Sequence, residues 1–200
     1  MSTGSVSSRI GYAARDDRLA ARAHALILGV VLFLASEVMF FAAIFAAYYD
    51  LRGRAQQWPP PGVHLAPLEP TIGTVLLALS DACAMFALAA IRRGRSGIAR
   101  RWLFATLALG IVFLSLTFHE WAGNSFTLAS HAYGSVHYAM TGFHAAHVTA
   151  GLVLIAFLAV GAREPAFRGA GAAGAEAIGY YWHFVFVVWL GIWATIWLVR

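Results

Sequence analysis

Residues 26–49, LILGVVLFLASEVMFFAAIFAAYY, decide what kind of fold this chain can adopt. Glu37 carries the only charged side chain in this stretch, and the residues around it are apolar or small. An apolar run of this length is typical of a membrane-spanning helix. A carboxylate near its middle costs about 2.5 to 3.5 kcal/mol on insertion-derived scales. We therefore expect Glu37 to be protonated, to pack against a polar partner, or to face water or a neighbouring subunit.

This first span is expected to present two different faces. Bulky side chains recur at helical spacing from Glu37, and they are Phe33, Phe40, Phe41, Ile44 and Tyr48. Small side chains gather at Ala42, Ala43, Ala46 and Ala47. Another helix could approach closely against this small face.

The whole chain has the composition of a polytopic membrane protein. Of its 200 residues, 60% are hydrophobic and 12% are charged, and the mean hydropathy is +0.71. Its apolar runs predict an all-α bundle of five membrane-spanning helices, at about residues 26–49, 71–91, 102–121, 136–160 and 177–199. Residues 1–23 are expected to form a polar tail, and residues 24–200 a single membrane domain.

The basic residues predict the orientation of the bundle. All 14 are arginines, and 11 of them fall in the tail, in residues 92–101 and in residues 163–168. Because each span crosses the membrane once, these three segments lie on the same side of it. By the positive-inside rule that side is cytoplasmic, so the N-terminus is expected inside and the C-terminus outside. The net charge of +5 is thereby explained by topology. No basic stripe with interleaved aromatic residues lies outside the spans, which argues against nucleic-acid binding.

Several classes of soluble enzyme are excluded by the motifs that the sequence lacks. There is no nucleophile elbow, phosphate-binding loop or dinucleotide fingerprint. Cys83 is the single cysteine, so the chain can form neither an internal disulfide nor a metal site built from cysteines.

Ionisable side chains inside the expected spans are the candidates for function. The carboxylates are Glu37, Asp81 and Glu120, and the candidate polar network around them consists of Ser36, His144, His147 and His183. On the fourth span, polar or small residues share one helical face: His137, Thr141, His144, His147 and Gly151. Three interpretations remain open. These residues could form a hydrogen-bonded structural network, take part in proton transfer, or, through the histidines, bind a haem or a metal.

A series of motifs resembles subunit III of the haem-copper cytochrome c oxidases. They occur in the order of that family and cover essentially the whole chain beyond the tail: Ser36-Glu37-Val38-Met39-Phe40-Phe41, Ala46-Ala47-Tyr48-Tyr49, Trp58-Pro59-Pro60, Tyr133-Gly134-Ser135-Val136, Thr141-Gly142-Phe143-His144, His147-Val148 and Tyr180-Tyr181-Trp182-His183-Phe184-Val185. The length and the five spans are similar to the short bacterial form, especially the actinobacterial type.

The resemblance implies a noncatalytic subunit of a respiratory oxidase in the bacterial plasma membrane. The complex would reduce oxygen to water and translocate protons, with haem and copper held by the partner subunits I and II. No catalytic, cofactor-binding or metal-binding residue is then expected in this chain. A bound phospholipid, support of proton uptake and of the stability of subunit I, and membership of a larger respiratory supercomplex are further expectations. Glu37 matches the membrane-embedded glutamate that the family associates with carbodiimide reactivity.

One residue departs from the family pattern. Family members usually carry an aspartate after Trp-His-Phe-Val, where this chain has Phe186. Three alternatives therefore stay open, namely a subunit III-like partner of a quinol oxidase or of a nitric oxide reductase, and a self-contained haem or metal protein using His137, His144, His147 and His183. A small transporter with Glu37 and Asp81 as coupling carboxylates is a further rival, although the sequence has no inverted repeat.

Overall fold

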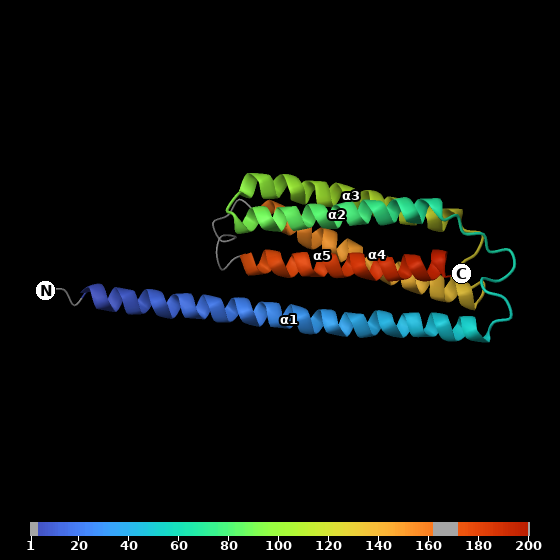
Figure 1. Cartoon of the computed structure of the whole chain (residues 1–200), viewed down its shortest axis with the longest axis horizontal. Coiled ribbons are helices and arrows are strands. Elements are labelled where there is room, and N and C mark those ends of the chain that lie inside the picture. Colours follow the sequence, from blue (N-terminus) through green and yellow to red (C-terminus); the bar gives the residue numbers. More distant parts are fainter. Residues whose placement is uncertain (1–3, 162–171, 200) are drawn as a thin grey trace.

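The computed structural model describes residues 4–161 and 172–199, and all regular structure within them is helical. In chain order the elements are α1 (Gly4–Arg54), α2 (Leu68–Arg92), α3 (Ser96–Gly123), α4 (Ala132–Gly161), α5 (Ala172–Trp193) and a π-helical end (Ala194–Leu198). Five helices are long and apolar enough to cross a membrane, which confirms the five-span prediction. They lie lengthwise beside one another, with α5 between α2 and α1 in the view of Figure 1.

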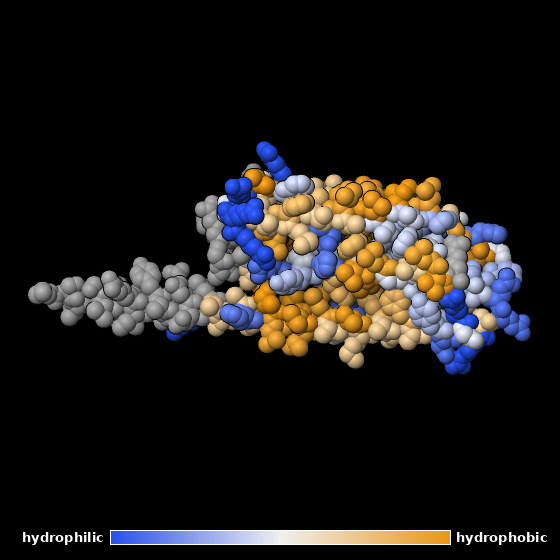
Figure 2. All heavy atoms as spheres, in the orientation of Figure 1, coloured by the Kyte–Doolittle hydropathy of each residue, from blue (hydrophilic) through white to orange (hydrophobic). Residues whose placement is uncertain are grey.

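The loops sort to the two ends of the bundle as the sequence predicts. The N-terminus and the α2–α3 turn lie at one end, whereas the α1–α2 and α3–α4 connections and the C-terminus lie at the other (Figure 1). On the face shown in Figure 2, most of the surface between the ends is apolar, and hydrophilic residues gather toward both ends. The basic loop at residues 163–168, which also entered the orientation argument, lies outside the described residues.

Helix α1 does not begin at the expected boundary after residue 23. It starts at Gly4 and runs for 51 residues, about 76 Å at the usual rise, so that its N-terminal part projects beyond the other helices (Figure 1). The polar tail is therefore a continuation of the first span. No proline occurs before Pro59, and alanine, leucine and arginine, all good helix formers, are frequent on both sides of the boundary.

Helices α2 and α3 form a tight hairpin. Gly94, with a φ angle of +68°, ends α2 in the left-handed conformation that glycine adopts at least cost. Its N–H donates to the carbonyl of Ile91, and the N–H of Arg95 donates to the carbonyl of Ala90, both at 2.9 Å. This pair of bonds is a Schellman motif, which satisfies the last carbonyls of the helix.

Between the α2 and α3 backbones, two buried hydroxyl groups form reciprocal contacts. The Ser80 hydroxyl donates to the carbonyl of Thr106 at 3.0 Å, and the Thr106 hydroxyl reaches the carbonyl of Ser80 at 3.4 Å. Both side chains are fully buried. Small polar residues of this kind allow membrane helices to pack closely and add hydrogen bonds between them.

Polar contacts also connect α2 to α5 along most of their length. The indole N–H groups of Trp193 and Trp189 donate to the hydroxyls of Thr71 and Thr74, at 3.3 and 2.9 Å. At the other end, Arg92 pairs with Glu176 at 2.9 Å. These contacts fix the register of the two antiparallel helices on both sides of the middle of the membrane.

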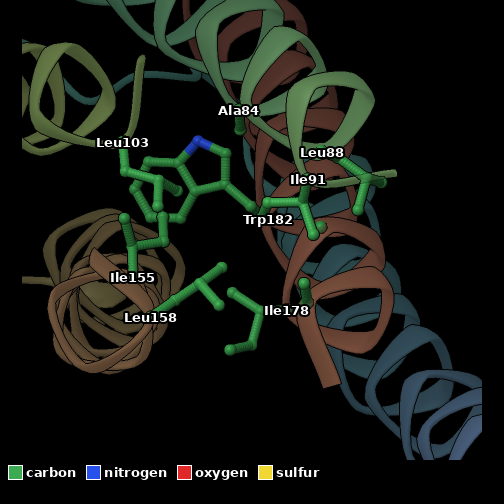
Figure 3. A pocket seen from close by; sticks show the side chains of 10 residues that line it. Ala84, Leu88, Ile91, Leu103, Ile155, Leu158, Ile178 and Trp182 are labelled. Carbon is green, nitrogen blue, oxygen red and sulfur yellow. The ribbon is translucent and has the colours of Figure 1, made fainter. Parts of the chain in front are cut away.

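Trp182 fills the centre of the bundle. Its indole is fully buried and extends from α5 toward Leu103, Ile155 and Leu158 (Figure 3). Glycines on two neighbouring helices make room for the ring. A Cβ atom added at Gly151 would lie 2.7 Å from Cε3 of Trp182, and one at Gly110 would lie 3.1 Å from Cη2. The close packing of α4 on α5 therefore depends on the missing side chain at residue 151.

We predict that Gly151→Ala lowers the stability of the folded chain by about 1 to 3 kcal/mol, because the added methyl group overpacks the contact with Trp182. The measurement is the thermal midpoint of the protein in mild detergent. Gly142→Ala is the matched control on the same helix, since nothing lies within 4 Å of its added Cβ. Equal midpoints for the two variants would contradict this description of the core.

Candidate functional site

Glu37 of α1 lies beside a histidine of α4. Its Oε2 atom is 2.9 Å from Nε2 of His147, and both side chains are largely covered, with 18% and 16% of their surface exposed. The rings of Phe40 and Phe41 pack against the imidazole, with centroids 6.4 and 5.1 Å away. The carboxylate that the first span must accommodate thus has a polar partner within the same chain.

The other nitrogen of His147 decides how protons are arranged in this pair. Nδ1 lies 2.7 Å from the carbonyl oxygen of Phe143. A carbonyl oxygen only accepts, so Nδ1 must carry a proton and donate. The bond between Nε2 and Glu37 then needs one more proton. This proton lies either on the carboxyl group, which donates to a neutral ring, or on Nε2, so that an imidazolium donates to a carboxylate. Both arrangements are neutral overall, which removes the main cost of a carboxylate inside a membrane.

A second pair joins α2 to α5 at a similar depth. Oδ2 of Asp81 lies 2.8 Å from Nδ1 of His183. The two side chains differ in environment, since 8% of the Asp81 side chain is exposed, against 57% of the His183 side chain. This contact lies between the tryptophan–threonine bonds and the Arg92–Glu176 pair, so polar contacts join α2 and α5 at several levels.

This second pair provides a physical explanation for Phe186. The ring of Phe186 lies 6.4 Å from that of His183, one turn further along α5, where the resemblance leads one to expect an aspartate. The acid that bonds to His183 comes instead from Asp81 on the adjacent helix. We infer that an aspartate on α2 takes the place of the expected one on α5.

The third carboxylate, Glu120 of α3, faces His137 of α4 at a longer distance. Oε1 of Glu120 is 3.9 Å from Nε2 of His137, which is beyond hydrogen-bond range. Neither atom has a hydrogen-bond partner among the described residues, and His137 is fully buried. Glu69 and Glu120 line the same small space, and Glu69 bonds to His119 at 3.2 Å.

Two members of the expected polar network make no such pair. The hydroxyl of Ser36 donates to the carbonyl of Phe33 on its own helix, at 2.7 Å. His144 is buried and stacks on Trp189 with centroids 5.0 Å apart, and its ring nitrogens have no hydrogen-bond partner among the described residues. In the described part of the chain, no three His, Cys, Asp or Glu side chains are grouped as a metal site would require.

The three carboxylates and their candidate polar neighbours were predicted from the sequence, but not which of them pair. The Ser80 hydroxyl, considered as a partner of Asp81, donates to the carbonyl of Thr106 instead. Glu69 was missed as a neighbour of Glu120, because it lies about 50 residues away in sequence and comes close only through the antiparallel packing of α2 and α3. The helical spacing predicted that the α4 histidines share one face, and this agrees only in part with the structure. His137 and His144 face the core, whereas His147 faces Glu37 of α1.

We predict that Glu37→Gln keeps the complex assembled, because the amide can still hydrogen-bond to His147. Glu37→Leu should cost about 1 to 3 kcal/mol, since it leaves the Nε2 atom of His147 without a partner. Adding His147→Leu should recover part of that loss, because both polar groups are then absent. Native gels of the detergent-solubilised complex measure assembly. Strictly additive losses in the double variant would show that the two side chains are not coupled.

We also predict that Asp81→Ala lowers the thermal midpoint and that adding Phe186→Asp restores part of it. An acid at residue 186 lies three residues from His183, on the same face of α5. Phe186→Asp alone is the control and should destabilise the protein, because it introduces a second intramembrane acid. If adding Phe186→Asp to Asp81→Ala lowered the thermal midpoint further, the inference that Asp81 takes the place of the expected aspartate at residue 186 would be wrong.

Comparison with known proteins identifies the family of this chain. The family model for cytochrome c oxidase subunit III matches residues 13–199. A probable cytochrome c oxidase subunit 3 from Nocardia farcinica is 39% identical over 184 residues, which cover 90% of each chain. Cytochrome c oxidase subunit 3 of Corynebacterium diphtheriae is 35% identical over 94% of this chain and 95% of its own length. That of Thermostichus vulcanus is 35% identical over 86% and 87%. The chain therefore belongs to the cytochrome c oxidase subunit III family.

Proposed function

We propose that this chain, as subunit III of a haem-copper oxidase in a bacterial membrane, acts without a redox centre of its own. Subunits I and II would hold the haems and copper and carry out oxygen reduction. This chain would support proton uptake by subunit I and protect that subunit during turnover. Its N-terminus would lie in the cytoplasm, because the tail and the α2–α3 loop are rich in arginine.

The contacts that the four intramembrane histidines make are the observation that best supports this proposal. Two of the four intramembrane histidines considered as haem ligands bond to carboxylates of other helices, namely His147 to Glu37 and His183 to Asp81. His137 lies beside Glu120, and His144 packs against aromatic rings. The four side chains thus have different partners and surroundings. A haem held by His147 or His183 would require its bond to a carboxylate to be broken.

We predict that an oxidase complex purified without this chain still consumes oxygen but loses activity faster during turnover. Adding the purified chain back should restore the slower decay, because the proposed role is to support subunit I rather than to supply a catalytic group. The measurement is the first-order decay of oxygen consumption under continuous turnover. Identical decay with and without the chain would refute the protective role.

An apolar groove between α1, α4 and α5 supports the proposal that a phospholipid binds here. Its volume is about 400 Å³, and its walls include Leu26 and Val30 of α1 and Leu154 of α4. Arg22 precedes Leu26 by four residues and is exposed, so it lies on the same face of α1 toward the arginine-rich end. An acyl chain in the groove and a phosphate near Arg22 would match this arrangement.

We predict that Ala150→Phe reduces the phospholipid that co-purifies with the chain, because the ring would occupy the groove that Ala150 lines. Val153→Phe serves as the control, since Val153 is exposed on the same helix but does not line the groove. Lipid retained per protein is measured by mass spectrometry after mild-detergent purification. Equal retention by the two variants would place the bound lipid elsewhere.

A further inference from the structure

His183 is an unusual residue to find on the outer surface of a membrane bundle. It lies ten residues after Ala173, the start of the fifth span, and fifteen before Leu198, its end. These separations correspond to about 15 and 22 Å along the helix. More than half of its side chain is exposed, at 57%, and Val187 beside it is exposed at 50%. A polar ring therefore points outward from the bundle near the middle of the span.

The pairing with Asp81 determines what the outward nitrogen of this ring can do. Nδ1 is engaged by Asp81, and Nε2 forms no hydrogen bond to the described residues. A neutral pair is strongly favoured at this depth over one with a net negative charge. Oδ1 of Asp81 is buried without a partner, so a proton on that oxygen would be left unsatisfied. The remaining neutral arrangements, an acid bonded to Nδ1 or an imidazolium beside a carboxylate, both leave a proton on Nε2.

Nε2–H is thus a hydrogen-bond donor without an acceptor among the described residues. Acyl chains offer no acceptor, and leaving a polar group unpaired in an apolar medium is costly. Lipid headgroups lie about 15 Å or more from this depth, too far for an imidazole side chain to reach. A second copy of this chain packed symmetrically through the same face would bring one donor against an identical donor. Of these candidates, a different protein chain is the one that can place an acceptor at this depth.

We propose that the outer surface of α5 around His183, formed with Tyr180, Val187 and Leu190, is where a membrane-spanning helix of the oxidase core packs against this chain. That helix presents a hydrogen-bond acceptor, such as a hydroxyl, an amide carbonyl or a carboxylate, to Nε2 of His183. The proposal rests on the proposed function and adds to it the face through which this chain binds its partner. Tyr180, Val187 and Leu190 are exposed at 44%, 50% and 37%, which leaves an apolar ridge for the partner to cover.

The test is photo-crosslinking in the intact complex. A photoreactive phenylalanine analogue is placed at Val187, one turn from His183, in the full chain expressed in its native membrane. The control position is Ile111 of α3, which is similar in size, exposure (55%) and depth but lies on another helix. We expect Val187 to crosslink to a large oxidase subunit and Ile111 to give mainly lipid adducts. Mass spectrometry of the crosslinked peptide should place a residue with an acceptor group near the attachment point.

The outcomes separate this proposal from the one on which it rests. A subunit crosslink from Ile111 but not from Val187 would keep the oxidase role and overturn the assignment of this face. A crosslink between two copies of the chain at Val187 would overturn it as well. If neither position, nor others around the bundle, crosslinked to any oxidase subunit, the proposed function itself would fail.

Two variants of His183 test the hydrogen bond within this interface. His183→Phe keeps a ring but removes the donor, and it should lower the Val187 crosslink yield roughly tenfold, the equivalent of one lost hydrogen bond. His183→Gln keeps an N–H donor and should retain most of the yield. If both variants crosslinked as well as the unmodified chain, the donor at His183 would have no part in docking.

Discussion

The cost of placing a carboxylate inside a membrane is the constraint on which the rest of this structure depends. Glu37, Asp81 and Glu120 come from three different helices, and each faces a histidine of another helix. Two of these contacts are direct hydrogen bonds. Because a carboxyl group and an imidazole can share one proton, such a pair stays neutral and still bonds. Carboxylates that would destabilise a single membrane helix therefore join neighbouring helices together.

The five helices are not equally integrated. Helices α2 to α5 enclose Trp182 and share most of the buried residues, whereas α1 buries only a small part of its span. Its attachment includes the Glu37–His147 pair and Tyr48 and Tyr49, whose hydroxyls reach Thr195 in the π-helical end that follows α5. The alanine face expected on this helix, which includes Ala42 and Ala46, is exposed in the described part of the chain. A surface of this kind suits a protein that functions inside a larger complex.

Much of this fold follows from local sequence. Apolar runs predicted the number of helices, and the arginine-rich turn around Gly94 ends α2 where expected. The pairing of helices was not predictable in this way, because hydrophobicity alone does not say which faces meet in a bundle. Asp81 illustrates the limit, since nothing near it in the sequence indicates His183, about a hundred residues away. The exposure of His183 likewise depends on packing, which only the structure shows.

The central claim is that the intramembrane histidines serve carboxylates and protein contacts rather than a haem. The most direct test is to purify the tagged chain from its native membrane in mild detergent and to record visible spectra before and after its partners are stripped away. Our interpretation predicts that a large haem-binding subunit co-purifies and that all haem absorbance leaves with it. A chain that keeps a Soret band on its own would contradict the claim and would make His137, His144, His147 or His183 a haem ligand.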